Sequence, residues 1–491
     1  MSGASGKRIL LRGAAWTVAM RWGVKMLGLI NTLVMARILM PSEYGIVAMA
    51  SIVVGIIESL LDFGAGTALL RKSKLNAGDI DSAWTLRVLQ GIAVGLLLIL
   101  LSPAASLYFS EPRVAPVLWT LGACVMVNGT TNIGLILAQK NFDFSIDFKV
   151  SITAAVVRVL VTIAAGLALG DYRALVIGIA VGLLTSTVLS YVMHPYRPRW
   201  NTKNIAEIWA VTKWLMLSNT GRYLMRRGDE LIAGRLVNSA GEFGVYSVGA
   251  DLGQLPTSEV GPAMQRAVLP LLSSMSGSAK EVNSVVVKVV NAVNTVTLPL
   301  GLGLAALSVP FTALVLGPNW AEAQFYIAGF AAVGVLQTMP GPINTLLVLR
   351  GYTKQHSMTV WFEFGALVLT ALALVPIFSL AGLVWARAIG AAVGFLRVAV
   401  FARGLCELSL RTLWGGLWRP VLGSLQMYIL VRWASTFAQS AIAQLAIGVT
   451  VGVVFYVGWC LLAWRLVGRP DGLESMALTW LAQKVGRRRS G

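Results

Sequence analysis

The sequence predicts an all-α protein that crosses a membrane many times. Of its 491 residues, 56% are hydrophobic and only 12% are charged, whereas charged residues make up about 25% of an ordinary soluble domain. The mean hydropathy is +0.74, and the apolar residues form long unbroken runs. A transmembrane β-barrel would instead show alternating segments of about ten residues. These observations exclude a soluble enzyme, a disordered chain and a secreted disulfide scaffold.

Runs of about 20 apolar residues, the length that crosses a bilayer, recur along the whole chain and suggest about 14 spans. The first run is too long and too charged for a signal peptide, so we expect it to be retained. The seventh and eighth runs are the least hydrophobic, which leaves a total of about 12 open. The expected spans lie near residues 14–38, 45–70, 82–109, 114–138, 147–170, 172–194, 207–237, 243–272, 284–316, 322–349, 358–379, 380–403, 417–436 and 441–464.

Basic residues outside the spans concentrate in alternate loops and at both termini. The opposite set of loops holds only Arg37, Arg113, Arg173 and Arg235. Because basic loops stay cytoplasmic, this bias predicts cytoplasmic termini and an even number of spans. It also accounts for more than half of the net charge of +19. No long basic segment lies outside the membrane, so nucleic acid is not an expected partner.

The last span is followed by a short basic tail. Around residues 473–481 apolar side chains recur at helical spacing, and basic residues follow them. This pattern is typical of an amphipathic helix lying on an anionic membrane surface, with a solvated tail as the alternative.

Metal, cofactor and catalytic sites are not expected. The cysteines Cys124, Cys406 and Cys460 are scattered without CxxC spacing, so they suggest neither a disulfide framework nor a metal site. The two histidines, His194 and His356, both lie near span ends. No carboxylates are spaced as a general acid and base. The sequence therefore does not predict an enzyme.

The chain contains an internal repeat. Residues 37–47 (RILMPSEYGIV) resemble residues 235–246 (RLVNSAGEFGVY) with one insertion. Both copies join two spans that run in the same order, so the halves are parallel repeats, as in several transporters. This organisation predicts a first lobe over residues 1–200, a second lobe over 201–405, and two extra spans with the basic tail over 406–491.

Two pairs of basic residues lie inside spans, where a charge costs about 2.5–3.5 kcal/mol at a helix centre. Arg21 and Lys25 are four residues apart in the first span, and Arg222 and Arg226 are four residues apart in the seventh. Each pair therefore lies on one helix face. Because the two spans are equivalent in the two halves, we expect the pairs to form a cationic cavity for an anion. Pairing with carboxylates of neighbouring helices is the alternative.

Carboxylates also occur within spans, and two roles for them remain open. They could carry protons or sodium, or they could neutralise the arginines, which we favour. The candidates are Glu58, Asp62, Asp229, Asp251 and Glu363.

Several short motifs follow one another between about residue 10 and residue 400. They are ARILMPSEYG (36–45), LDFG (61–64), QKNFDF (139–144), RGD (227–229), GEFGVY (241–246) and two Leu-Pro pairs (255–256 and 269–270). In order and spacing they resemble the Wzx-type polysaccharide flippases, most closely the exopolysaccharide-exporter branch with the colanic acid exporter. Lys140 and Gly228 depart from that pattern.

This resemblance implies the multidrug/oligosaccharidyl-lipid/polysaccharide superfamily, with two six-helix lobes in a V shape and two extra C-terminal helices. It implies a bacterial inner-membrane protein that flips undecaprenyl-pyrophosphate-linked oligosaccharide to the periplasmic leaflet, for exopolysaccharide or O-antigen biosynthesis. Membrane lipids, a polysaccharide polymerase and export machinery are the implied partners. By their place in spans 1 and 7, Arg21, Lys25, Arg222 and Arg226 would correspond to the family's cationic cavity.

Two other functions are weighed against this one. A cation-coupled exporter of small molecules from the same superfamily would need a cavity dominated by carboxylates and aromatic residues. A membrane polymerase or ligase of polysaccharides would need a sizeable periplasmic loop with catalytic residues, and the loops here are short. A pyrophosphate diester carries about two negative charges, which suit bidentate arginine contacts.

Overall fold

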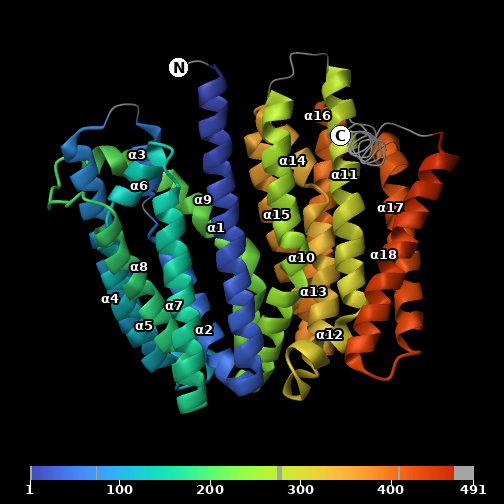
Figure 1. Cartoon of the computed structure of the whole chain (residues 1–491), viewed down its shortest axis with the longest axis horizontal. Helices are drawn as coiled ribbons and strands as arrows, with labels where there is room; N and C mark the ends of the chain where they lie inside the picture. The colour runs from blue at the N-terminus through green and yellow to red at the C-terminus, as the bar shows by residue number, and fades with distance from the viewer. Residues whose placement is uncertain (1–2, 63, 73–74, 274–278, 407–409, 469–491) are drawn as a thin grey trace, which may run out of the picture. The chain divides into compact units, whose positions relative to one another are not determined.

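The computed structural model describes residues 3–62, 64–72, 75–273, 279–406 and 410–468 (Figure 1). Within these ranges the regular structure is helical, with one short 3-10 turn and no strand. The chain divides into two compact units, Met1–Gly244 and Val245–Gly491. The predicted amphipathic tail lies outside the described residues. The predicted lobe boundaries near residues 200 and 405 stay predictions.

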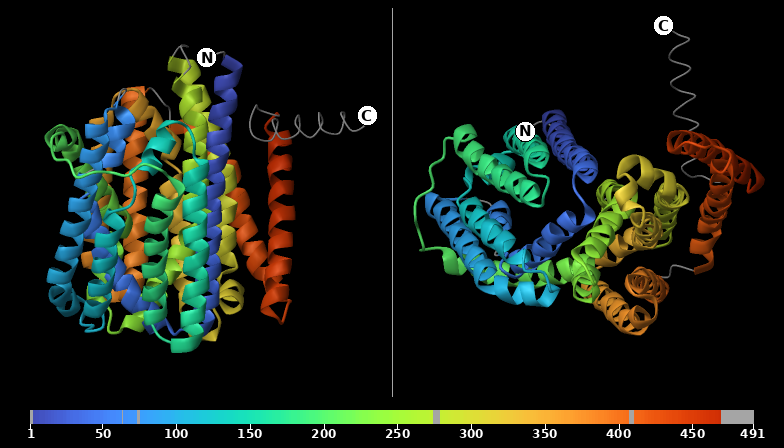
Figure 2. Two further views of the ribbon diagram at one scale, coloured as in Figure 1. Left: turned by 60° about the vertical axis from the view of Figure 1, so that its left-hand side comes forward. Right: turned by 90° about the horizontal axis from the view of Figure 1, so that it is seen from below.

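The first unit is built from helical hairpins. Helix α4 packs against α5, α7 packs against α8 and along α1, and α9 packs against α2 (Figures 1 and 2). The helices are α1 (Gly3–Ile38), α2 (Pro41–Leu60), α3 (Ala65–Arg71), α4 (Ala77–Phe109), α5 (Val114–Gly129), α6 (Gly134–Lys140), α7 (Ser145–Leu169), α8 (Arg173–Met193) and α9 (Ile205–Leu236).

The second unit starts within α10 and follows the same plan. Helix α15 packs against α16, and α11 packs against both α13 and α17. Helix α17 also contacts α18. Buried Val290, Ile343 and Val398 join α11, α14 and α16 in one apolar cluster. The elements are α10 (Ala240–Ser273), α11 (Ala279–Ala306), α12 (Ser308–Val315), the 3-10 turn Pro318–Trp320, α13 (Ala323–Thr338), α14 (Gly341–Leu349), α15 (Thr353–Phe378), α16 (Leu380–Cys406), α17 (Leu410–Ser435) and α18 (Ala441–Leu466).

Each expected span coincides with one helix or with two consecutive helices. In the described ranges, ten helices are long and apolar enough to cross a membrane, and α5 with α6 forms an eleventh candidate bent by 57°. Helices α9, α10 and α17 are long enough but are not among these candidates. The all-α polytopic fold class is thus confirmed, and a count of about 14 spans is consistent with it.

Four expected spans are interrupted, which the apolar runs did not predict. The second breaks after α2, where Gly64 takes the left-handed φ of 56° and its N–H donates to Asp62 Oδ1 at 2.9 Å. The tenth breaks at Pro340 and Pro342, which lie where α14 begins and have no N–H to continue a helix. The fourth bends between α5 and α6, and the ninth divides into α11 and α12. Hydropathy is insensitive to such breaks because the flanking residues stay apolar.

The two copies of the repeat touch each other through equivalent glycines. A Cβ atom on Gly45 of α2 would lie 1.8 Å from the carbonyl oxygen of Ala240, and one on Gly244 of α10 would lie 2.0 Å from that of Pro41. All four residues belong to the first unit. Because the two backbones approach so closely, only glycine fits at either position.

We expect Gly45→Ala and Gly244→Ala each to destabilise the protein by about 1–3 kcal/mol, the usual cost of overpacking. Gly28→Ala in α1 is the matched control, because a Cβ there meets nothing within 4 Å. That change should be neutral or slightly stabilising, since alanine favours a helix by about 0.5–1 kcal/mol. Thermal unfolding of the purified proteins checks this, and equal melting of Gly45→Ala and Gly28→Ala would contradict the close crossing.

Candidate functional site

The first cationic pair lies on α1. Arg21 is exposed and Lys25 is half-buried, and both fall within the apolar stretch Ala15–Ile38. Only 11% of the most apolar window of this stretch is buried. Helix α1 contacts α7 through Trp16, whose ring centroid lies 4.8 Å from that of Phe148.

The second cationic pair lies on α9, where both Arg222 and Arg226 are exposed. Asn219 stands one turn before Arg222. Its amide Nδ2 donates to Asp62 Oδ2 at 2.5 Å, and its Oδ1 accepts a hydrogen bond from Arg222 Nη2. Because one amide is both donor and acceptor, it joins a carboxylate to a guanidinium. The orientation of Arg222 is therefore fixed by Asp62, two residues after the end of α2.

Further bonds lock α9 onto α2. Thr220 Oγ1 donates to the Ser59 carbonyl at 3.0 Å, and the Tyr223 hydroxyl donates to the Ile52 carbonyl at 3.1 Å. Gly55 makes room for this tyrosine, since a Cβ there would lie 2.3 Å from its hydroxyl oxygen. The Ser59 carbonyl lies in the last turn of α2, where it would otherwise lack a partner. These bonds set the rotation of α9 and hence the face on which its arginines stand.

The remaining charges of α9 are arranged differently. Arg227 and Glu230 form an ion pair. Asp229 is only 2% exposed and Glu230 only 4%. Both acidic residues stand about one turn after Arg226 on the same side of α9, and they are buried, whereas Arg222 and Arg226 are exposed.

The predicted site residues are divided between the two units. Arg21, Lys25, Glu58, Asp62, Arg222, Arg226 and Asp229 belong to the first unit, and Asp251 and Glu363 belong to the second. Among them, Asp62 and Arg222 are joined by hydrogen bonds through Asn219. Glu58 is exposed, one turn before Asp62. Glu363 packs against Gly394, where a Cβ would lie 2.8 Å from its Oε2. The roles of these residues stay predictions.

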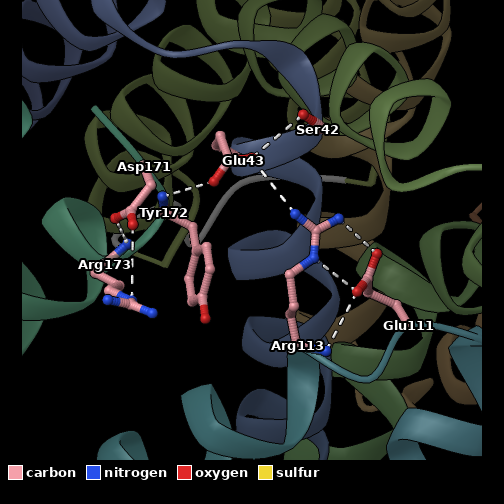
Figure 3. Close-up of polar contacts among 7 residues, drawn as sticks. All are labelled: Ser42, Glu43, Glu111, Arg113, Asp171, Tyr172 and Arg173. Atoms are coloured by element: carbon pink, nitrogen blue, oxygen red, sulfur yellow. Dashed lines mark hydrogen bonds and ion pairs between the residues drawn. The ribbon is translucent and has the colours of Figure 1, made fainter. Parts of the chain in front are cut away.

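A polar network fixes the N-terminal end of α2 (Figure 3). Glu43 Oε2 accepts the N–H of Tyr172 at 2.8 Å, and Glu43 Oε1 lies 3.5 Å from Arg113 Nη1. Arg113 also holds Glu111 with two hydrogen bonds of 2.8 and 2.9 Å. These bonds keep the pKa of Glu111 below its usual value. The α1–α2, α4–α5 and α7–α8 connections therefore meet at one end of the first unit, as the alternation of basic and non-basic loops predicts.

The opposite end of this unit gathers the other connections. Lys140 Nζ donates to the carbonyls of Leu69 and Lys72, at the end of α3. This bond gives the unexpected lysine in the QKNFDF motif a structural role. Two hydrogen bonds attach the segment before α9 to α4. The Tyr196 hydroxyl donates to Asp81 Oδ1 at 2.7 Å, and Asn204 Nδ2 donates to Asp79 Oδ1 at 2.7 Å.

His194 lies at this same end and caps a local turn. Its Nδ1 accepts the N–H of Tyr196 at 3.2 Å. Burial, and next the charge of Arg197, lower the pKa of His194. In the described ranges no three His, Cys, Asp or Glu side chains come together as a metal site.

Sequence reasoning missed Asn219, Tyr223 and Arg158. The signal available for Asn219 was an amide inside an expected span, one turn before an arginine. Its partner lies on a helix far away in the sequence, so spacing alone could not identify the bridge. Arg158 was one of several arginines within spans, and nothing in its neighbourhood set it apart.

A family model connects this geometry to known proteins. Residues 34–324, more than half of the chain, match the family described as polysaccharide biosynthesis protein, and the chain belongs to this family. It is 23% identical over 449 residues to the lipopolysaccharide biosynthesis protein WzxC of Escherichia coli (strain K12), covering 90% of this chain and 88% of the relative. It is 22% identical over 489 residues to the succinoglycan biosynthesis transport protein ExoT of Rhizobium meliloti (strain 1021), covering 93% and 94%.

Solved structures agree on the fold. The lipid II flippase MurJ, in an inward closed conformation, gives a TM-score of 0.73 at 12% identity over 92% of this chain and 99% of that chain. A multidrug resistance MATE family transporter of the MOP superfamily, in an inward-facing conformation, gives 0.60 at 14% identity over 78% and 96%. The resemblance to Wzx-type polysaccharide biosynthesis proteins is thus confirmed, and the two solved structures share the fold of this chain. The chain is a multi-pass membrane transport protein and not an enzyme, so the polymerase and ligase alternative is set aside.

Proposed function

We propose that this protein flips undecaprenyl-pyrophosphate-linked oligosaccharide from the cytoplasmic to the periplasmic leaflet of a bacterial inner membrane. Transport would proceed by alternating access, between an inward-open and an outward-open form. The observation that carries the proposal is the exposed Arg222–Arg226 pair on α9, with Arg222 oriented by Asn219 and Asp62.

The chemistry of these residues favours an anion as ligand. Charged side chains at membrane depth face a water-filled cavity or the bundle interior, and they mark substrate pathways. Guanidinium groups bind phosphate through two parallel N–H···O bonds. A guanidinium held by a neighbouring amide loses less conformational freedom when it binds. The two arginines and the pair on α1 would together supply four cationic groups for the roughly two negative charges of a pyrophosphate diester.

A cation-coupled small-molecule exporter is the second candidate. The exposed carboxylate of Glu58 within α2 and the likeness in fold to a MATE transporter support it. In that case neutralising Glu58 would abolish transport, and the arginines would act only as counter-ions.

Analysis of lipid-linked intermediates in a strain that lacks the protein tests the proposal. A flippase leaves the pyrophosphate-linked oligosaccharide in the cytoplasmic leaflet, and the wild-type gene restores its export. Normal export of the polysaccharide in the deletion strain would reject the proposal.

We further propose that both termini are cytoplasmic, which cysteine labelling checks. In a variant without Cys124, Cys406 and Cys460, Ser239→Cys should react with an impermeant thiol reagent added outside. Thr202→Cys, in the segment before α9, should react only after permeabilisation. Both positions are exposed. The reverse labelling pattern would invert the orientation.

A further inference from the structure

Arg158 is a further cation in the middle of a span of the first unit. It lies in α7 (Ser145–Leu169), at least about 16 Å from either end at 1.5 Å rise per residue. That is farther than its side chain can extend to reach the membrane surface. The side chain is exposed, and its guanidinium forms no ion pair or hydrogen bond with the part of the chain that the structure describes.

This exposed side chain does not lie on the lipid side of α7. Leu160 and Leu167 are 63% and 73% exposed and mark that side. At about 100° per residue, Arg158 stands about 200° from Leu160 and about 180° from Leu167, on the opposite face. A charged group at membrane depth on such a face borders the bundle interior or a water-filled space.

The aliphatic part of Arg158 is held in place by α8. A Cβ atom on Gly182 would lie 3.1 Å from Arg158 Cβ and 3.3 Å from its Cδ. The missing side chain at Gly182 thus gives the arginine stem a surface to lie on. The aliphatic stem of Arg158 is restrained, while its guanidinium group remains available to bind an anion.

Helix α7 runs parallel to α1, and this sets the depth of Arg158. A Cβ on Gly23 would lie 2.6 Å from Ile152, and one on Gly166 would lie 2.5 Å from Met35. The residue numbers rise together along both helices, which pack side by side (Figure 2).

With this register, Arg158 stands about 3–6 Å beyond Lys25 and about 9–12 Å beyond Arg21 along the helix axes. Packed helices lie about 8–10 Å apart. The three cations therefore occupy one region of the α1–α7 pair, at a depth where an unneutralised charge costs about 2.5–3.5 kcal/mol.

We infer that Arg158 contacts the pyrophosphate of the substrate, together with Arg21 and Lys25. This inference rests on the proposed function. It assigns a binding role to α7, a helix for which the sequence predicts no site residue.

The test is binding of farnesyl pyrophosphate, with uncharged farnesol as reference, to the purified full-length protein in nanodiscs. Arg158→Met keeps the stem against Gly182 and removes the charge, and it should weaken pyrophosphate binding by about ten-fold or more, as expected for a lost charge-assisted hydrogen bond. Arg397→Met is the matched control. That arginine also lies in a span, but its guanidinium carbon lies 3.5 Å from the ring centroid of Phe362, so its loss should leave binding unchanged.

A chemical rescue separates charge from packing. In the cysteine-free background, Arg158→Cys should bind weakly, and modification with a cationic aminoethyl thiol reagent should restore binding. A neutral reagent of similar size should not restore it. This rescue experiment also tests the role of Arg158 if the Arg158→Met variant is poorly folded.

The outcomes distinguish the two proposals. The role of Arg158 is overturned if Arg158→Met or unmodified Arg158→Cys binds pyrophosphate as tightly as the wild type while Arg222→Ala binds it weakly. That result leaves the proposed function intact. A wild-type protein that does not distinguish farnesyl pyrophosphate from farnesol overturns both.

Discussion

Replacing Arg222 and Arg226 together with alanine is expected to abolish export while the protein remains in the membrane. Each charge-assisted hydrogen bond is worth about 1.5–3 kcal/mol, so the loss of two weakens substrate binding by a factor of about 10² to 10⁴. Arg222→Lys should also be impaired, because an ammonium cannot reproduce a bidentate guanidinium contact. Export of the polysaccharide and membrane content of each variant are the measurements.

Two further variants control this experiment. Arg173→Ala removes a charge from a side chain that is 67% exposed at the first residue of α8, and it should leave export unchanged. Asn219→Leu removes the bridge to Asp62 but keeps both arginines, and it should reduce export less than the double variant does. Full export by the double variant would contradict the assignment of the α9 pair to substrate binding.

Transport is expected to respond to the membrane potential more strongly than to a proton or sodium gradient. An inside-negative potential favours outward movement of an anion by about 2.3 kcal/mol per charge per 100 mV. If the cavity carries a net charge of about +2, it is nearly neutral when loaded, and the same field then acts on the return of the empty cationic cavity. The contacts of Asp62 support this preference, since its two oxygens accept from Asn219 and from the Gly64 N–H. A carboxylate with these partners has a structural role already.

Reconstituted vesicles with a potassium-diffusion potential and no proton or sodium gradient check this expectation. Glu58→Gln is the informative variant, because Glu58 is an exposed carboxylate of α2. It should transport at the wild-type rate under the potential. Transport that ignores the potential, follows a pH or sodium gradient and is lost in Glu58→Gln would make that carboxylate the coupling site.

Hydropathy predicted the positions of the helices well because bilayer thickness fixes the length of an apolar run. It did not predict the breaks at Gly64 and Pro340, which depend on a backbone angle and on a missing N–H. The repeat was visible in the sequence, but the contact between Gly45 and Gly244 was not. Close packing of helices depends on the shapes of the two helix surfaces that meet. A single sequence does not show which helix packs against which face.

The candidate site was predictable only in part, for a similar reason. A spacing of four residues puts Arg222 and Arg226 on one face of any helix, so the pair was apparent before the structure. The bridge through Asn219 requires α9 to pack on α2 in one rotation, which Thr220 and Tyr223 set by bonds to distant carbonyls. Arg158 gained its significance only from the register between α1 and α7.

The most direct test of the central claim is movement of a pyrophosphate-linked lipid between leaflets of vesicles that contain only this protein. We expect the wild-type protein to move a fluorescent undecaprenyl-pyrophosphate-linked sugar, and the Arg222→Ala, Arg226→Ala variant not to move it above the rate in empty vesicles. A neutral prenol-linked sugar should remain in its leaflet with either protein. Equal movement of the charged lipid by the wild type and the double variant would contradict the account, as would failure of the wild-type protein to move it at all.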